Sequence, residues 1–580
     1  KGGAEHVCGA SFDASAEWAT VRIPRQRFDA PFTADIDIAR INLPAGVDLC
    51  IRRAGVTVGN EAYRTEMTAR TRRMLDHFIW RDAVLQSRGL TLPVMADALS
   101  DLRQALEAGR FDAVDEIRTR IDTAWWFGIE LSALRAMNDA NLDRATALHD
   151  ETLLAEARTH AGAIADLFRR AEAAKAVADL PDPAAAYEDE DSLAERTMTA
   201  VTAADLRPSV KGRCYYSPSG KPIHLYAVHS FFASREGMYE GGFDLAYRRI
   251  AGLGFNGIRF EAQPYQFMPT PDGPDAAVAE SYRRSIRTAW KYGLWVHYDN
   301  HFYLPGWACQ SPEEFAGSQP SGQSNFYQNR EAVLRLWSAT ADALADCKNI
   351  LLFETPGNEP MFYDMDGSII LRIPSMMHAW NQFLKARYTS RAALAEAWTA
   401  SVEFPTENAL RADEDWDGDT IQPPGIVESG LADPKNQTAR LWDWIIFARD
   451  LQAATSAAVA GTVQDRIPAA TFMQQYIIGD EFNHDPISLS YQSIIQARTD
   501  ASVFLGSHYG AAGYQVLKAV ALGTPSSDSE YPAEDRYGAF LIQKLLNSGL
   551  CIFADYGRWG GGMLWENDAA DFKPSTRYVP

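Results

Sequence analysis

Cysteine is scarce in this sequence, and the cysteines present do not form a ligand pattern. The 580 residues include 6 cysteines, which lie far apart with no C-x-x-C pair. That spacing excludes a zinc ribbon and a dense disulfide framework, so we expect free thiols and no metal site. The chain also lacks an apolar run close to the roughly 20 residues that cross a bilayer. Its mean hydropathy is −0.25. We therefore expect a soluble protein with no membrane partner.

Positive charge is also under-represented. Lys and Arg number 55 against 76 Asp and Glu, which leaves a net charge of −21. Such a chain repels phosphate backbones and anionic lipid surfaces, so nucleic acid is not expected as a partner. Aromatic residues make up 11% of the sequence and include 15 Trp. Broad ring faces suit the stacking of polyhydroxylated ligands, and they equally fill hydrophobic cores.

The ends of the sequence leave its compartment open. It starts at Lys1-Gly2-Gly3 without a Met, which is compatible with a secreted or periplasmic protein whose signal has been removed and equally with a cytoplasmic one. A homo-oligomer is compatible with the sequence as well.

The pattern of apolar and polar residues changes twice within the first 210 residues. Residues 1–60 alternate apolar and polar side chains in the manner of strands, which predicts a small β-rich unit. Residues 61–180 have helical periodicity, which predicts an all-helical domain. Residues 181–210 contain Pro181, Pro183 and the acidic run 188–191. We expect a linker there, because a packed element rarely contains such a run.

From residue 211 to residue 580, short apolar runs alternate with amphipathic helical patterns, the rhythm of βα units around a parallel sheet. The sequence predicts an α/β fold, a (β/α)₈ TIM barrel with a large insertion at about 361–468 after its fourth strand. The eight expected strands are Ile223–His229, Gly257–Glu261, Leu294–Asn300, Ile350–Glu354, Ala469–Gln474, Ser502–His508, Thr524–Glu530 and Leu550–Asp555.

Two of these strands end in carboxylates at positions where a barrel carries its chemistry. Reacting groups of such barrels sit at the carboxyl ends of the strands, because the βα loops there build the deep pocket. Glu359 follows strand 4 and Glu530 ends strand 7. Two carboxylates facing each other across the barrel mouth suit double displacement at a glycosidic bond. Asp528, Glu534 and Glu566 are the alternative carboxylates if the register of strand 7 is shifted.

Around this pair the residues resemble the retaining glycoside hydrolases of clan A, which are (β/α)₈ enzymes with two catalytic glutamates on strands 4 and 7. The likeness extends to three more strand ends. The segments that carry it are Asn358-Glu359-Pro360, Gly254-Phe255-Asn256-Gly257-Ile258-Arg259, His297-Tyr298-Asp299-Asn300-His301 and Ser507-His508-Tyr509. The resemblance implies that Arg259 supports the nucleophile and that His297, His301, His508 and Tyr509 contact the sugar or lie near the nucleophile.

After strand 4 the sequence is similar to family 42, the β-galactosidase type, in Phe383–Ser390 and Leu394–Trp398. The likeness covers about residues 223–566 and implies an exo-acting β-galactosidase-like enzyme with a carbohydrate substrate and no cofactor. An endo-acting β-glycanase of the same clan remains an alternative. A non-catalytic carbohydrate-binding or scaffolding protein on a barrel, with the 61–180 helices as its interaction surface, is a third.

The mechanism assigns each residue a duty. Glu359 is the expected acid/base, and Glu530 is the expected nucleophile. Asn358, beside the acid/base, is expected to bond the sugar 2-hydroxyl in the transition state. Trp307 and Trp559 are the expected stacking platforms. His297 and His301 would form a metal pair on a helix, but on a strand they lie about 13 Å apart, so a sugar contact is favoured.

Overall fold

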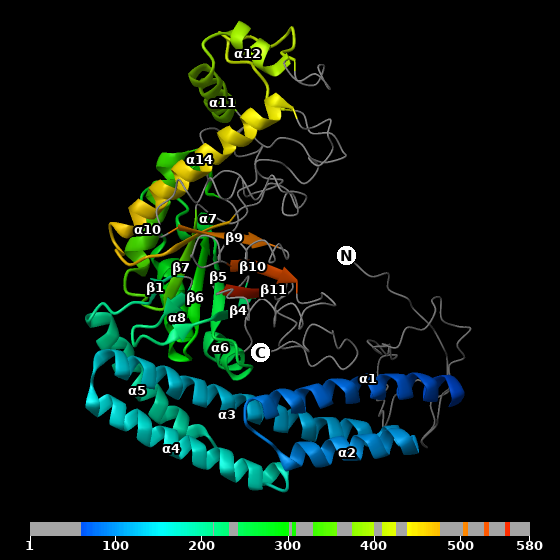
Figure 1. Ribbon diagram of the computed structural model, residues 1–580. Coiled ribbons are helices and arrows are strands. Elements are labelled where there is room, and N and C mark those ends of the chain that lie inside the picture. The colour runs from blue at the N-terminus through cyan, green and yellow to red at the C-terminus, as the bar shows by residue number, and fades with distance from the viewer. Residues whose placement is uncertain are drawn as a thin grey trace, which may run out of the picture. The chain divides into compact units, whose positions relative to one another are not determined.

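The computed structural model describes most of the helical half of the chain and the strands of the other half (Figure 1). The described residues are 60–212, 214–230, 242–300, 304–308, 329–355, 374–399, 409–424, 438–475, 503–508, 527–532 and 552–556. The chain divides into two compact units, Lys1–Thr71 and Arg72–Pro580. The β-rich unit expected over 1–60 lies outside the described residues except for its last position. Among the helices of the described ranges, none combines the length and the apolar composition that crossing a bilayer requires.

Residues 61–180, where we expect an all-helical domain, consist of helices joined by short connections. The helices are α1 (Asn60–Ser87), α2 (Pro93–Ala108), η2 (Phe111–Ala113), α3 (Val114–Leu148), α4 (Glu151–Ala173) and η3 (Val177–Asp179). Helix α3 runs without a break to Leu148. It ends where His149 adopts a left-handed φ of 53°, and Asp150 then caps α4 by accepting from the backbone N–H of Thr152 at 2.9 Å. Asx side chains stabilise helix starts in this way.

The expected linker over 181–210 is wrong for most of its length, because residues Ala184–Ala203 form helix α5. Its acidic run is not uniformly solvated. Glu190 is 0% exposed. Its carboxylate accepts from Asn138 Nδ2 at 2.7 Å and from Asn141 Nδ2, and it lies 3.2 Å from Nδ1 of His160. Partners on α3 and α4 thus solvate a carboxylate that the sequence pattern alone assigned to the surface.

Helices α2 to α5 share one hydrophobic core with part of the α/β half. Buried side chains such as Leu102 of α2 and Leu134 of α3 belong to the same cluster as Ile250 and Ile286 of the α/β half. Arg144 of α3 donates to the carbonyl of Trp290 at 2.8 Å. The helices and the α/β half therefore do not bury separate cores.

The α/β half opens with a three-stranded antiparallel sheet. This sheet is formed by β1 (Ser209–Lys211), β2 (Cys214–Tyr216) and β3 (Pro222–Ile223). The eight strands that follow are β4 (Leu225–Ser230), β5 (Gly257–Ala262), β6 (Trp295–Asn300), β7 (Ile350–Thr355), β8 (Phe472–Gln475), β9 (Val503–His508), β10 (Ser527–Pro532) and β11 (Ile552–Tyr556).

All eight expected strands are present, and each begins within three residues of its expected start. They pair in parallel and in sequence order, and β11 returns to β4, so the sheet closes (Figure 1). The expected parallel α/β architecture is thus confirmed. The helices described between these strands are α6 (Gly242–Gly252), α7 (Pro264–Phe267), α8 (Ala276–Lys291), η5 (Gly306–Ala308) and α10 (Arg330–Leu344).

The long segment after β7 adds three helices, α11 (Pro374–Arg387), α12 (Arg391–Thr399) and α14 (Ala439–Gln464). In Figure 1, α11 and α12 lie near one end of α14. These helices bury a cluster of their own around Trp380, Trp398 and Trp444. Asp443 holds it together, because its carboxylate accepts from the Tyr388 hydroxyl at 2.6 Å and from Nε1 of Trp398 at 2.8 Å. The expected insertion thus carries a packed aromatic core.

Candidate active site

A cluster of charged side chains fills the inside of the barrel. Arg259 on β5, Asp299 on β6 and Glu354 on β7 are each 0% exposed. Nη2 of Arg259 donates to Oδ2 of Asp299 at 2.9 Å and to Oε2 of Glu354 at 3.0 Å. Because β6 lies between β5 and β7, the contact from Arg259 to Glu354 runs across the barrel interior. Buried charges are tolerated only where they are paired in this way.

Strand alternation explains how the sequence places these groups inside. On β5, Ile258 and Phe260 belong to the core shared with the helices, while Arg259 and Glu261 alternate with them. The register then sets Glu261 beside Asp299, and Asp299 beside Glu354. Residues paired in a parallel sheet share a face, so one row of acidic residues crosses three strands.

A separate small hydrophobic cluster borders the charged cluster. It includes Leu225 and Ala227 of β4, Leu352 of β7 and Met473 of β8. The register pairs Leu352 with His297 and Met473 with Glu354, so apolar and charged side chains alternate between neighbouring strands.

His297 belongs to the charged cluster. It is 0% exposed, and its Nε2 lies 2.8 Å from Oε2 of Glu354. The alignment falls short of a hydrogen bond, so we treat the contact as electrostatic. Its Nδ1 has no hydrogen-bond partner among the described residues. The sugar contact expected of His297 would therefore use Nδ1.

Further buried polar atoms at the carboxyl ends of β6 and β7 also have spare hydrogen-bonding capacity. Oδ1 of Asn300 accepts from the Tyr298 hydroxyl at 3.3 Å, while its Nδ2 has no partner among the described residues. The hydroxyl of Thr355, the last residue of β7, has none among them either. Among all the residues that the structure describes, no group of three or more His, Cys, Asp or Glu side chains is arranged to hold a metal ion.

The backbone of β10, the seventh strand of the closed sheet, brings two of the expected site residues together. Glu530 on β10 is the register partner of His508 on β9, at the carboxyl end of both strands. The register shifts between Asp528 and Glu530. A bulge of this kind re-aims the residues that follow it and is common beside active sites.

Several expected site residues lie outside the described residues. These are Asn358, Glu359, His301, Tyr509 and Trp559. Glu359 follows Thr355, the last residue of β7, by four positions. Trp307 is described in η5, where it is half-buried and its Nε1 donates to the carbonyl of Met268 at 2.8 Å. Its indole N–H is thus already bonded, which leaves the ring face as the part available for stacking.

Sequence reasoning missed Glu261, Asp299 and Glu354 as site residues, although a signal for them was present. Each is an acidic residue inside an otherwise apolar strand, and two of them lie two positions after Arg259 or His297. Charged residues at i and i+2 of a buried strand point to the same face. That spacing predicts a polar barrel interior.

Comparisons with known proteins give no family assignment. No family model matches the sequence, and no curated protein is similar to it. Similar solved structures include the catalytic domain of a β-amylase from Paenibacillus polymyxa, with 11% identity and a TM-score of 0.42 over 61% of this chain and 97% of that chain. The catalytic domain of an endoglucanase from Thermobifida fusca has 11% identity and a TM-score of 0.36 over 65% of this chain and 97% of that chain.

A β-galactosidase from a Rahnella species has 12% identity and a TM-score of 0.38, over 57% of this chain and 50% of that chain. All three TM-scores are below 0.5, so these likenesses do not decide the function of this chain.

Proposed function

We propose that this chain is a retaining glycoside hydrolase built on a (β/α)₈ barrel, with Glu359 as acid/base and Glu530 as nucleophile. The observation that carries the proposal is the strand count. β7 and β10 are the fourth and seventh strands of the closed sheet. Glu530 lies on β10, and Glu359 follows β7 by four residues. Strands on opposite sides of a barrel direct their ends toward a common mouth, as two cooperating carboxylates require.

The reaction proceeds in two steps. Glu530 attacks the anomeric carbon while Glu359 gives its proton to the departing glycosidic oxygen, which forms a glycosyl-enzyme and releases the aglycone. Glu359 then takes a proton from water, which attacks the same carbon, regenerates the Glu530 carboxylate and restores the original anomeric configuration. We expect the two carboxyl groups to be about 5 to 5.5 Å apart, because the nucleophile must reach the carbon directly.

The buried charged side chains inside the barrel also support this proposal. Arg259 is held rigidly by Asp299 and Glu354, since all three are buried and its Nη2 bonds both carboxylates. A fixed charge in a dry interior stabilises developing charge more effectively than a mobile one in water. The unfilled bonding capacity of Asn300 and Thr355 lies at the same ends of the strands. Polar groups of this kind bind sugar hydroxyls.

A panel of nitrophenyl β-glycosides tests the proposal. Wild-type protein should hydrolyse at least one member, and galactosides are expected first. Glu359→Gln should lower kcat/KM on substrates with poor leaving groups by at least about 100-fold, because general acid catalysis typically contributes that much. Glu396→Gln, an exposed glutamate on α12, is the matched control and should leave the rate unchanged.

The panel also distinguishes the substrates. Turnover of aryl galactosides with no action inside polysaccharides supports the exo-acting β-galactosidase type, whereas internal cleavage of a β-glycan supports the endo-acting alternative. A wild-type protein that is inert on all of them would contradict the proposed activity.

A further inference from the structure

A cavity of about 300 Å³ lies at the end of the barrel opposite the proposed catalytic site. Its lining includes Asn256 just before β5, Trp295 at the first position of β6, and Lys348 just before β7. All three mark the amino ends of strands. Side chains of α3 form the facing wall. The volume is at the lower end of the range of small-molecule sites.

The charge of this lining is opposite to that of the protein. Five cationic side chains and two carboxylates line the cavity, so their formal charge is +3 in a chain of net charge −21. Three of the cations are arginines, namely Arg88, Arg135 and Arg144. Among the described residues, no carboxylate oxygen lies within ion-pair distance of any of these three guanidinium groups.

Arg88 and Arg135 approach each other despite their like charges. Arg135 donates to the backbone carbonyl of Arg88, and Arg88 donates to the carbonyl of Leu253 at 3.0 Å. Nε of Arg88 is buried and has no hydrogen-bond partner among the described residues. Burial, together with the charge of Arg135, lowers the pKa of the Arg88 guanidinium. Two like charges side by side repel each other, and an anion between them would relieve that repulsion.

The backbone accommodates this arrangement at one position. Gly254 has a φ of +97°, and a Cβ there would collide with the guanidinium of Arg88. The glycine thus permits both the left-handed turn before β5 and the close approach of the arginine. Arg144 is held as firmly, since it donates to Thr197 Oγ1 at 2.9 Å, to Asn141 Oδ1 at 2.7 Å and to the Trp290 carbonyl, all of them uncharged.

The two carboxylates of the lining offset these charges only in part, since five cations face them. Asp143 attracts Arg144, and its Oδ1 also accepts from the hydroxyls of Ser217 at 3.0 Å and Ser219 at 2.5 Å. Asp139 is exposed, and the charges of Lys221 and Arg135 both act on it.

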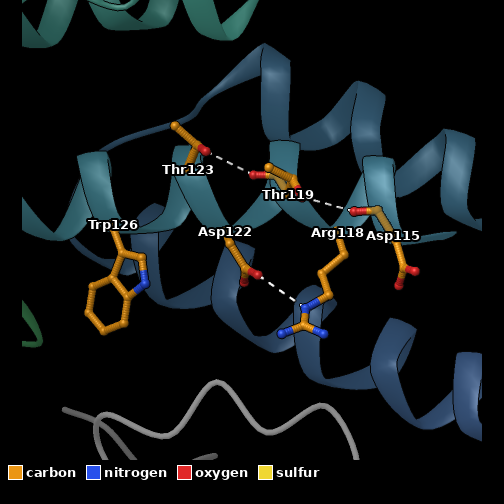
Figure 2. A pocket seen from close by; sticks show the side chains of 6 residues that line it. All are labelled: Asp115, Arg118, Thr119, Asp122, Thr123 and Trp126. Atoms are coloured by element: carbon orange, nitrogen blue, oxygen red, sulfur yellow. Dashed lines mark hydrogen bonds and ion pairs between the residues drawn. The ribbon is translucent and has the colours of Figure 1, made fainter. Parts of the chain in front are cut away.

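A second hollow on α3 shows the contrast (Figure 2). There Nε of Arg118 lies 3.3 Å from Oδ2 of Asp122, whose other oxygen pairs with Arg81 at 2.5 Å. Arg118, which lines that hollow, is paired with a carboxylate of the same lining. The cavity beneath the barrel instead keeps a formal charge of +3 after its two carboxylates are counted.

The geometry points to a binding site for a small oxyanion, inorganic phosphate or a phosphate monoester, in the cavity lined by Arg88, Arg135 and Arg144. Guanidinium groups bind phosphate oxygens through parallel N–H donors, which a point charge cannot do. The site is separate from the catalytic mouth, so its ligand would act on the base of the barrel rather than on the glycosidic bond.

Isothermal titration of the full chain tests this site with three probes: inorganic phosphate, glucose 6-phosphate and glucose. We expect saturable binding of phosphate that depends on Arg135. Any binding of glucose should be the same in the wild type and in Arg135→Gln. Arg135→Gln should weaken phosphate binding at least about tenfold, as loss of a charge-assisted bond implies. Arg103→Gln changes an exposed arginine of α2 outside the cavity and should bind as the wild type does.

Two further measurements keep the result decisive. Lys221→Gln alters an exposed cation of the same lining, poses little risk to folding, and should weaken phosphate binding by a smaller factor. Phosphate should raise the unfolding temperature of the wild type more than that of Arg135→Gln, because a ligand of the folded state stabilises it. Glucose 6-phosphate binding would identify a monoester as ligand, and phosphate binding alone would identify the free ion. Absence of saturable phosphate binding, or equal affinity in wild type, Arg135→Gln and Lys221→Gln, would overturn the inference.

Discussion

Arg259→Met should destabilise the barrel strongly, because it removes the guanidinium that two buried carboxylates share. Asp299 and Glu354 are both 0% exposed and both accept from Nη2 of Arg259. Methionine keeps the unbranched aliphatic part of the side chain but lacks the guanidinium, so it cannot donate a hydrogen bond or carry charge. The double variant described next separates the loss of the ion pairs from the loss of packing.

The expected cost follows from burial. Removing one partner of a buried ion pair costs about 3 to 5 kcal/mol, because the remaining charge stays in the protein without compensation. Two carboxylates lose the same guanidinium here, while His297 stays 2.8 Å from Glu354, so we expect a value within that range. The double variant Arg259→Met with Glu354→Gln should lose less than the sum of the two single variants, because neutralising the glutamate removes one of the stranded charges.

Urea unfolding followed by tryptophan fluorescence measures these costs as shifts of the midpoint at constant m-value. Arg103→Met is the matched control. Arg103 is exposed on α2, so its loss should change stability by less than about 0.5 kcal/mol. A cost below about 1 kcal/mol for Arg259→Met, or strictly additive single variants, would show that the buried cluster is not held together by this arginine.

Two further predictions concern titrating groups. Burial raises the pKa of Glu190 against the opposing bonds from Asn141 and Asn138. Its contribution to stability is therefore complete below about pH 4.5 and is lost as pH rises through the raised value. Wild type should lose more thermal stability than Glu190→Gln between pH 5 and pH 8, and parallel melting curves would contradict this. Burial also raises the pKa of the Cys347 thiol to about 12, so iodoacetamide at pH 8 should modify half-buried Cys214 in the native protein while sparing Cys347. Peptide mass mapping before and after denaturation checks this, and equal labelling of both native thiols would refute it.

The strands were predictable because each is a short apolar run bounded by turn residues and separated from the next by a helical pattern. β5 and β7 begin at Gly257 and Ile350, the residues that the sequence indicates. A strand buried on both faces is apolar along most of its length, so its position is clear. The same apolar background makes Glu261 and Glu354 stand out as charged residues directed inward.

Helix α5 was not predictable from local composition. Its acidic run resembles a solvated segment, and the groups that stabilise Glu190 lie far away in the sequence, on α3 and α4. Asn141 of α3 takes part in the same network, because its side chain bonds both Glu190 and Arg144. Contacts with residues far away in the sequence decide whether such segments become helical, and a single sequence does not show these contacts.

The cavity beneath the barrel could not be anticipated for the same reason. Arg135 and Arg144 lie within a helix and Arg88 lies just after one, and only the fold brings them to the amino ends of the strands.

The most direct test of the proposed mechanism compares azide rescue in Glu359→Ala and Glu530→Ala, with an activated aryl β-glycoside as substrate. Without Glu359, the glycosyl-enzyme still forms but is hydrolysed slowly, and azide should attack it to give the β-glycosyl azide of retained configuration. Without Glu530, no covalent intermediate forms, and azide should attack the substrate itself to give the inverted α-glycosyl azide. Proton NMR of the products distinguishes the two anomers. Opposite anomers from the two variants are the predicted result. The same anomer from both, or substantial activity of Glu530→Ala on natural glycosides, would contradict the assignment of Glu530 as the nucleophile.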